Sequence, residues 1–175
     1  MQHRRLHSIP APGKLELLGE GSGFRNTLYS MLAKAKCFEK FTQNDLELLA
    51  DLMKAYRAPP DTTIVIEGEH NSCLCVLIEG RVGVFKEDDR GVIKHLASIM
   101  QGRAFGEISL IDDLPFSASV ITATESVFLL MSRECFYNCV DTHPVLGVRL
   151  LRLVGGMLCQ RLRATSVHLV DLIDV

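Results

Sequence analysis

The spacing of apolar residues changes abruptly in the middle of this chain, and that change constrains the fold more than any other feature. Up to about residue 59, apolar side chains recur every three or four positions, as they do along one face of a helix. Over residues 62–131 they alternate or form short runs, and glycines such as Gly68 and Gly80 separate the runs. Many short strands separated by turn residues indicate a β-sandwich or a jelly-roll barrel. The sequence therefore predicts an α+β fold that is mainly β, with a barrel over about residues 55–132.

Six segments carry the strand pattern and account for most of a barrel of about eight strands. They are residues 62–67, 73–78, 82–86, 92–100, 120–122 and 126–131. The polar sequence EDDRG between the third and fourth segments predicts a hairpin tip. We expect these segments to form a jelly-roll barrel, also called a double-stranded β-helix.

Two helices are expected before the strands. Residues 25–36 carry apolar side chains at helical spacing. Thr42 can cap a second helix, with Asp45 three residues later in the capping-box position. The Pro-Pro pair at 59–60 is expected to end this helix, because proline cannot continue it. Residues 1–24 contain several prolines and glycines and are expected to form an irregular lead-in, before a single domain over residues 25–175.

Helices are also expected after the strands, over about residues 132–166. Ser132 can start a short helix that runs through Cys139, and a longer helix has Pro144 in its first turn and ends at about residue 166. Its apolar stripe is wide: Leu146, Leu150, Leu153, Met157 and Gln160 form a heptad-like seam, and Val154, Leu158 and Leu162 broaden it. The stripe can pack on the chain's own barrel or against a second copy. Its width favours a homodimer through residues 144–163.

The six cysteines do not form a recognisable metal site. Cys73 and Cys75 would share one face of a strand, and Cys135 and Cys139 one face of a helix. Neither pair has the CxxC spacing of zinc sites. Because free cysteine is among the most buried residue types, we expect buried thiols and no metal.

Composition and charge exclude several classes of function. The net charge of −2 gives no electrostatic footprint for nucleic acid. No apolar run reaches the roughly 18 residues of a membrane span, and the basic amino terminus lacks the apolar core of a secretory signal. The sequence shows no nucleophile–base pair, metal cluster or phosphate-binding loop, so we do not expect an enzyme. A cytoplasmic protein is the expectation.

Residues 105–120, FGEISLIDDLPFSASV, carry the strongest indication of a ligand site. Gly106 can present its backbone N–H to an anion at the start of a helical turn, where partial positive charge gathers. Glu107 follows, and a carboxylate accepts hydrogen bonds from a pair of hydroxyls. This arrangement suits a ligand with a phosphate at one end and sugar hydroxyls beside it.

The same stretch resembles the phosphate-binding cassette of the cyclic nucleotide-binding domain family. That family includes the catabolite activator proteins and the regulatory subunits of cyclic AMP-dependent kinases. In it, a Phe-Gly-Glu opening and a short helix precede a Pro-Arg-Ser/Thr-Ala return. Gly106, Glu107, Leu110, Pro115, Ser117 and Ala118 fit this pattern. The order of segments, including IVIEGE and LIEGRVGVFK, also resembles the family from about Phe38 onward.

The resemblance implies a set of ligand-contacting positions: Phe105, Gly106, Glu107, Ile108, Ser109, Phe116, Ser117 and Ala118. Alternatives remain for each role. Gly106 can serve only a tight turn, Glu107 can make an internal hydrogen bond, and the hydroxyls of Ser109 and Ser117 can bond the local backbone instead of a phosphate.

Phe116 departs from the family pattern, because it stands where the family carries the arginine that clamps the cyclic phosphate. Removing one partner of a buried Arg–phosphate pair costs about 2–5 kcal/mol, or roughly 30-fold to several thousand-fold in affinity. Arg103 and Arg133 flank the cassette, but the sequence does not place either over the phosphate.

Two functions follow from the resemblance. The first is a stand-alone regulatory sensor, with cyclic AMP or cyclic GMP as a possible ligand held weakly or not at all. The second is a dimeric interaction module that regulates a partner protein without binding nucleotide. Only twelve residues follow Arg163, too few for a helix-turn-helix module that reads DNA.

Overall fold

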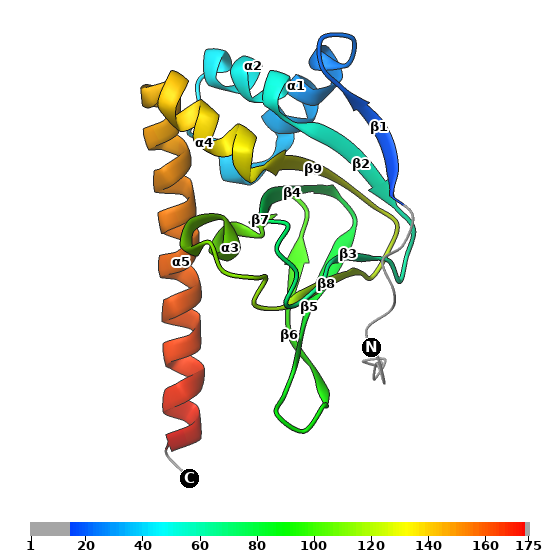
Figure 1. Cartoon of the computed structure of the whole chain (residues 1–175), viewed down its shortest axis with the longest axis vertical. Coiled ribbons are helices and arrows are strands. Elements are labelled where there is room, and N and C mark those ends of the chain that lie inside the picture. Colours follow the sequence, from blue (N-terminus) through cyan, green and yellow to red (C-terminus); the bar gives the residue numbers. More distant parts are fainter. Residues whose placement is uncertain (1–14, 174–175) are drawn as a thin grey trace. The chain divides into compact units, whose positions relative to one another are not determined.

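Two antiparallel β-sheets form the centre of the structure (Figure 1). The computed structural model describes residues 15–173. The five-stranded sheet contains, in order, β1 (Glu16–Glu20), β2 (Lys54–Ala58), β9 (Ser126–Ser132), β4 (Cys73–Glu79) and β7 (Ala104–Phe105). The four-stranded sheet contains β3 (Thr63–Val65), β8 (Ser119–Thr122), β5 (Arg81–Glu87) and β6 (Ile93–Met100). Strands β2 to β9 confirm the predicted mainly β fold.

One hydrophobic core joins the two sheets. The five-stranded sheet contributes Leu77 and Phe128, and the four-stranded sheet contributes Val82 and Val120. Leu77 and Phe128 lie opposite each other in the β4–β9 pairing, so the alternation of each strand places both on the inner face. Tyr56 stacks on Phe128 with ring centroids 5.8 Å apart. The apolar alternation in the sequence is therefore the inner lining of a jelly roll.

The predicted end of the second helix is wrong. Helix α2 (Gln43–Leu52) ends before the proline pair, and Lys54–Ala58 forms β2. Ala55 lies opposite Leu129 of β9 and is completely buried. Pairing with β9 decides the structure of this segment, because strand formation depends on neighbours more than on local propensity.

The predicted irregular lead-in is wrong over Glu16–Glu20, which form the edge strand β1 beside β2. Glu16 pairs with Arg57 and Glu20 with Lys54 across the two strands. Cross-strand charge pairs of this kind stabilise an edge strand modestly. The first fourteen residues of the expected lead-in lie outside the described residues.

Helices α1 (Arg25–Lys34) and α2 pack against each other at one end of the sheets (Figure 1). The capping box is confirmed: Thr42 Oγ1 accepts from the Asp45 backbone N–H at 3.3 Å, and Asp45 Oδ2 accepts from the Thr42 N–H at 2.7 Å. This reciprocal pair satisfies two backbone donors that the first turn of a helix leaves open.

The chain divides into two units, Met1–Phe136 and Tyr137–Val175. Helix α4 (Arg133–Thr142) begins after Ser132, whose Oγ accepts from the Cys135 N–H at 3.2 Å. Helix α5 (Pro144–Ile173) starts at the predicted proline but continues beyond its predicted end near residue 166. Among the described residues, no helix has the length and apolar character needed to cross a membrane.

Candidate ligand-binding site

Strand β7 ends at Phe105, and the chain then turns at Gly106. The φ of Gly106, +87°, lies in the left-handed region, and a Cβ at this position would lie 2.3 Å from the Cys73 carbonyl oxygen. Only glycine fits such a close approach to a neighbouring strand with this backbone conformation. The turn therefore fixes where helix α3 (Glu107–Asp112) leaves the sheet.

Helix α3 buries two of the side chains that the resemblance assigns to the ligand. Glu107 has no exposed surface and Ser109 is buried with it, as is the neighbouring Leu110. The Ser109 hydroxyl donates to the Gly106 carbonyl at 3.3 Å, which is the local backbone bond that the sequence left open as an alternative. A carboxylate at the depth of Glu107 is costly unless hydrogen bonds satisfy it. The buried Glu107 carboxylate therefore requires hydrogen-bond partners.

Arg133 holds the other end of α3. Its Nη1 donates to the carbonyl oxygens of Ser109 and Leu110, each at 3.2 Å, and lies 2.9 Å from Asp113 Oδ1. A cation at a helix carboxyl terminus satisfies open carbonyls and opposes the negative end of the helix dipole. This flanking arginine thus caps α3.

Phe116 faces inward and belongs to the hydrophobic core with Phe105 and Phe128; only 7% of its surface is exposed. Its backbone is held on both sides: its N–H donates to Glu69 O at 3.0 Å, and its carbonyl accepts from the Gly68 N–H at 2.9 Å. The side chain at the family's clamp position is therefore an apolar core residue, which offers no charge to a phosphate.

Lys86 is a basic residue beside the cassette that the sequence pattern did not reveal. Its Nζ donates to the Ser117 carbonyl at 2.7 Å and pairs with Glu67 Oε1 at the same distance. Glu67 also binds the strands on both sides, since its Oε2 accepts from the Glu87 N–H and its own N–H donates to Ser119 Oγ. The carboxylate of Glu67 therefore offsets the positive charge of Lys86.

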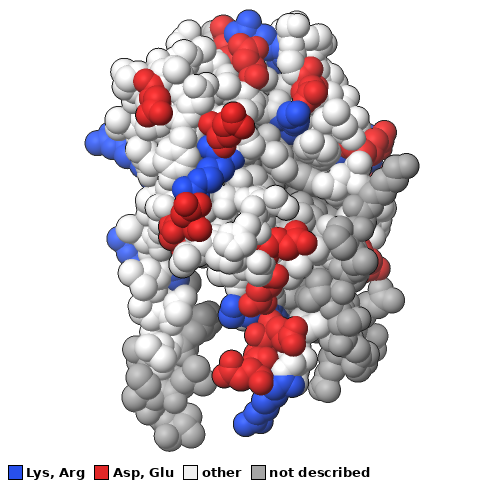
Figure 2. Space-filling model, viewed as in Figure 1, with Lys and Arg blue, Asp and Glu red and all other residues white. Residues whose placement is uncertain are grey.

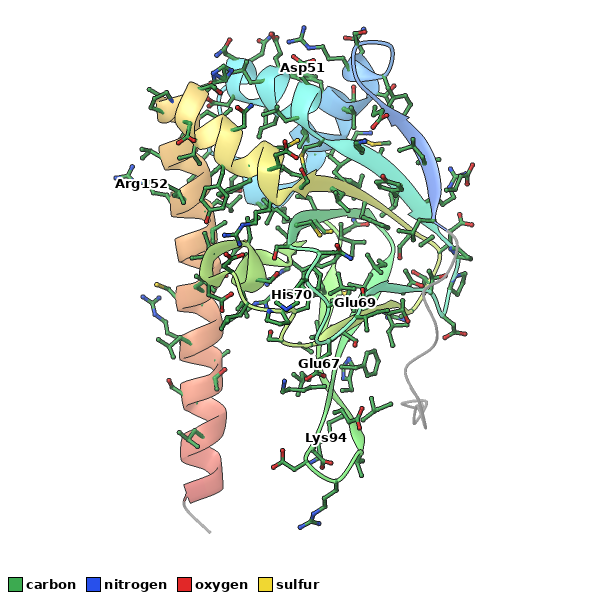
Figure 3. All side chains as sticks on the ribbon, viewed as in Figure 1. Asp51, Glu67, Glu69, His70, Lys94 and Arg152 are labelled. Atoms are coloured by element: carbon green, nitrogen blue, oxygen red, sulfur yellow. The ribbon has the colours of Figure 1, made fainter. Side chains whose placement is uncertain are left out.

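The remaining predicted positions vary in exposure. Phe105 is buried, Ile108 and Ala118 are half-buried, and Ser117 is exposed. Acidic side chains gather on the face of the molecule that Figure 2 shows. Glu67 and Glu69 both lie on this face (Figure 3). Negative charge near the return strand opposes the approach of an anion.

The cysteines match their predicted burial in part. Cys73, Cys75 and Cys139 are buried, whereas Cys159 on α5 is exposed. Burial raises the pKa of Cys139 above its usual range. Among the residues that the structure describes, no three His, Cys, Asp or Glu side chains form a group that could hold a metal ion.

Two antiparallel sheets that share one core form a jelly-roll domain. A short helix, α3, follows one of the strands at Gly106, whose φ is positive. This arrangement is typical of domains that carry a ligand cassette. A family model of the cyclic nucleotide-binding domain matches residues 56–143, which is half of the chain. The chain belongs to the cyclic nucleotide-binding domain family.

Its relatives are regulators. The chain is 29% identical over 143 residues to a CRP-like cAMP-activated global transcriptional regulator of Mycobacterium tuberculosis, covering 82% of this chain and 62% of that protein. It is 34% identical over 88 residues to the cAMP-dependent protein kinase regulatory subunit of Aspergillus fumigatus, covering 50% of this chain and 21% of that one. The chain thus spans less than two thirds of the length of these relatives.

Similarity to a solved structure extends over most of the fold. A cyclic nucleotide-binding domain from Methylobacillus flagellatus superposes with a TM-score of 0.77 at 27% identity, covering 90% of this chain and 88% of that one. The superposed region is therefore longer than the segment that the family model matches.

Proposed function

We propose that this chain is a regulatory sensor domain of the cyclic nucleotide-binding type whose affinity for cyclic AMP and cyclic GMP is weak or lost. The observation that carries the proposal is Phe116, a core side chain at the position where the family places its phosphate-clamping arginine. Losing one partner of a buried charge pair costs about 2–5 kcal/mol. A micromolar site would fall toward the millimolar range.

The contacts around the cassette also support a weak or lost affinity for cyclic nucleotides. Arg133 is engaged at the carboxyl end of α3, and Lys86 is paired with Glu67. Recruiting either cation to a phosphate would break contacts that it already makes. The turn at Gly106 and the buried Glu107 are nevertheless kept, so the sugar side of the site retains the family's residues.

Titration calorimetry with cyclic AMP and cyclic GMP tests this proposal. We expect no binding of either nucleotide at low micromolar concentration and at most a weak heat signal near millimolar. Low micromolar affinity for the native chain would refute the assignment of Phe116, because another cation would then have to hold the phosphate.

An interaction module that regulates a partner protein is the second candidate, and helix α5 favours it. Leu150 of the predicted seam and Val154 beside the seam are buried, so they are not available to a partner. A second stripe is exposed. It comprises Val148, Leu151, Leu162 and Leu169, all on one heptad register, with the half-buried Leu158 between them. Such a row suits a helix of a second copy, and we propose a homodimer through it.

Light scattering on matched variants tests the dimer. The pair Leu151→Glu and Leu162→Glu places charges in the exposed stripe and should give folded monomers. Gln160→Glu is the control, because Gln160 is exposed and lies off the stripe. A native chain that is already monomeric at high micromolar concentration would remove the interaction module in its dimeric form.

The proposed function does not include catalysis. The relatives are a transcriptional regulator and a kinase regulatory subunit. We expect regulation to pass through a ligand or a protein partner.

A further inference from the structure

Strand β4 carries a pair of buried thiols that the ligand site does not explain. Cys73 and Cys75 point to the same side of the strand, and their Sγ atoms lie 3.7 Å apart. Cys75 is completely buried, whereas Cys73 keeps 8% of its surface exposed. Both are free thiols. The two sulfurs are close enough to react with each other, and Cys73 is the more exposed of the two residues.

The contact between the sulfurs makes the two thiols chemically unequal. The hydrogen bond between the two sulfurs lowers the pKa of Cys73, while the same bond and burial raise the pKa of Cys75. Thiolate is the form that attacks oxidants, and a second thiol beside it can resolve the product. Because Cys73 is the more exposed residue and Cys75 is completely buried, Cys73 suits the attacking role and Cys75 the resolving role.

We propose that Cys73 and Cys75 form an oxidant-responsive dithiol beside the cassette, with peroxides as the oxidant class. The Cys73 sulfur attacks the O–O bond of hydrogen peroxide, which gives a sulfenic acid and one water. The Cys75 sulfur then displaces the hydroxyl group from that sulfenic acid, which forms the S–S bond and releases a second water. Two thiols are oxidised to one disulfide, and one peroxide is reduced to two waters.

Strand geometry determines what this bond does to the fold. Residues two apart on a strand have Cα atoms about 6.4–6.8 Å apart, at the upper end of the roughly 4.4–6.8 Å that a disulfide spans. Closing the bond must therefore shorten β4 locally. The carbonyl of Cys73 lies against Gly106, and Cys75 is paired with Phe105. The distortion reaches the start of α3, and a strained disulfide of this kind is readily reduced again.

Peptide mapping of the oxidised full-length chain tests the proposal. Trypsin releases residues 58–81 as one peptide that contains both thiols, and residues 134–149 as another that contains Cys135 and Cys139. After hydrogen peroxide treatment, we expect the first peptide to lose two hydrogen atoms and the second to stay reduced. Alkylatable thiols should fall from six to four per chain, and dithiothreitol should restore them.

Variants assign the two roles. Cys75→Ala should leave a sulfenic acid on Cys73 that dimedone traps, and Cys73→Ala should abolish oxidation of peptide 58–81. Cys159→Ser is the matched control, because this exposed thiol lies on α5, and it should leave the disulfide unchanged. If an alanine variant fails to fold, the mapping of the native chain decides by itself.

Two results would overturn the inference. One is a folded chain whose peptide 58–81 stays reduced while Cys159 is oxidised. The other is a disulfide that forms without changing amide hydrogen exchange over residues 105–112, since the structure couples β4 to this segment through Gly106. Neither measurement involves a nucleotide, so failure here is distinct from failure of the proposed sensor function.

Discussion

Replacing Phe116 with arginine should convert this chain into a cyclic AMP-binding protein, at a measurable cost in stability. Truncating a core phenylalanine to alanine costs about 3–5 kcal/mol. The methylenes of arginine keep part of that packing, so we expect a loss of about 2–4 kcal/mol. A domain with about 5–15 kcal/mol of stability remains folded after such a loss.

The restored charge pair should recover a large part of the missing 2–5 kcal/mol in binding free energy. At a cyclic AMP concentration 100 times its dissociation constant, the variant gains about 2.7 kcal/mol of stability from ligand. For a domain of this size, that gain raises the melting temperature by about 5–10 °C. A site that is 100-fold weaker gains only about 0.4 kcal/mol at the same concentration, or about 1 °C.

Thermal melts with and without cyclic AMP, followed by titration calorimetry, measure both quantities. Phe116→Met is the matched control, since it removes the ring without adding charge and should lose stability without gaining affinity. Adding Glu107→Gln to Phe116→Arg should reverse the gain, because the two contacts hold opposite ends of one ligand. If Phe116→Arg folds but gains no affinity, the site has been remodelled for another purpose, and the interaction module replaces the sensor.

Three further outcomes follow from the structure. The double variant Leu151→Glu, Leu162→Glu should be a folded monomer by light scattering, whereas the native chain should be a dimer. Gly106→Ala should lower stability by at least about 2 kcal/mol, because it adds a backbone clash to an unfavourable φ; in thermal melts, Gly68→Ala should cost less, since a Cβ there meets nothing within 4 Å. Burial raises the pKa of Cys37 from 9.0 to about 12. Its contribution to stability should therefore be full below about pH 9 and lost as the pH rises toward 12, and iodoacetamide should label it later than the exposed thiol of α5.

Local patterns were sufficient to predict most of the sheet. The alternation in β5 and the apolar run of β4 specify strands wherever they are placed, and the Thr42 capping box is complete within four residues. Strand β2 was missed because no glycine or proline separates its five residues from the preceding helix. The strand that pairs with it, β9, lies far along the chain.

The cassette was predicted as a sequence motif, but its contacts could not be. Lys86 and the Ser117 carbonyl are 31 positions apart, and Arg133 and Ser109 are 24 apart. No spacing rule relates such positions until the sheets are assembled. The inward orientation of Phe116 was likewise undetermined, because a phenylalanine just before a strand suits the core and the surface equally well by pattern alone.

The two backbone hydrogen bonds of residue 116, to Gly68 and Glu69, have a consequence for how this family changes over time. Neither bond involves the side chain, so the path of the segment between α3 and β8 is set independently of the residue that stands there. Exchanging this one residue can replace a phosphate clamp with a core side chain, or the reverse, while the segment keeps its path. Ligand affinity in such a domain can therefore be gained or lost at a single position, without a new fold.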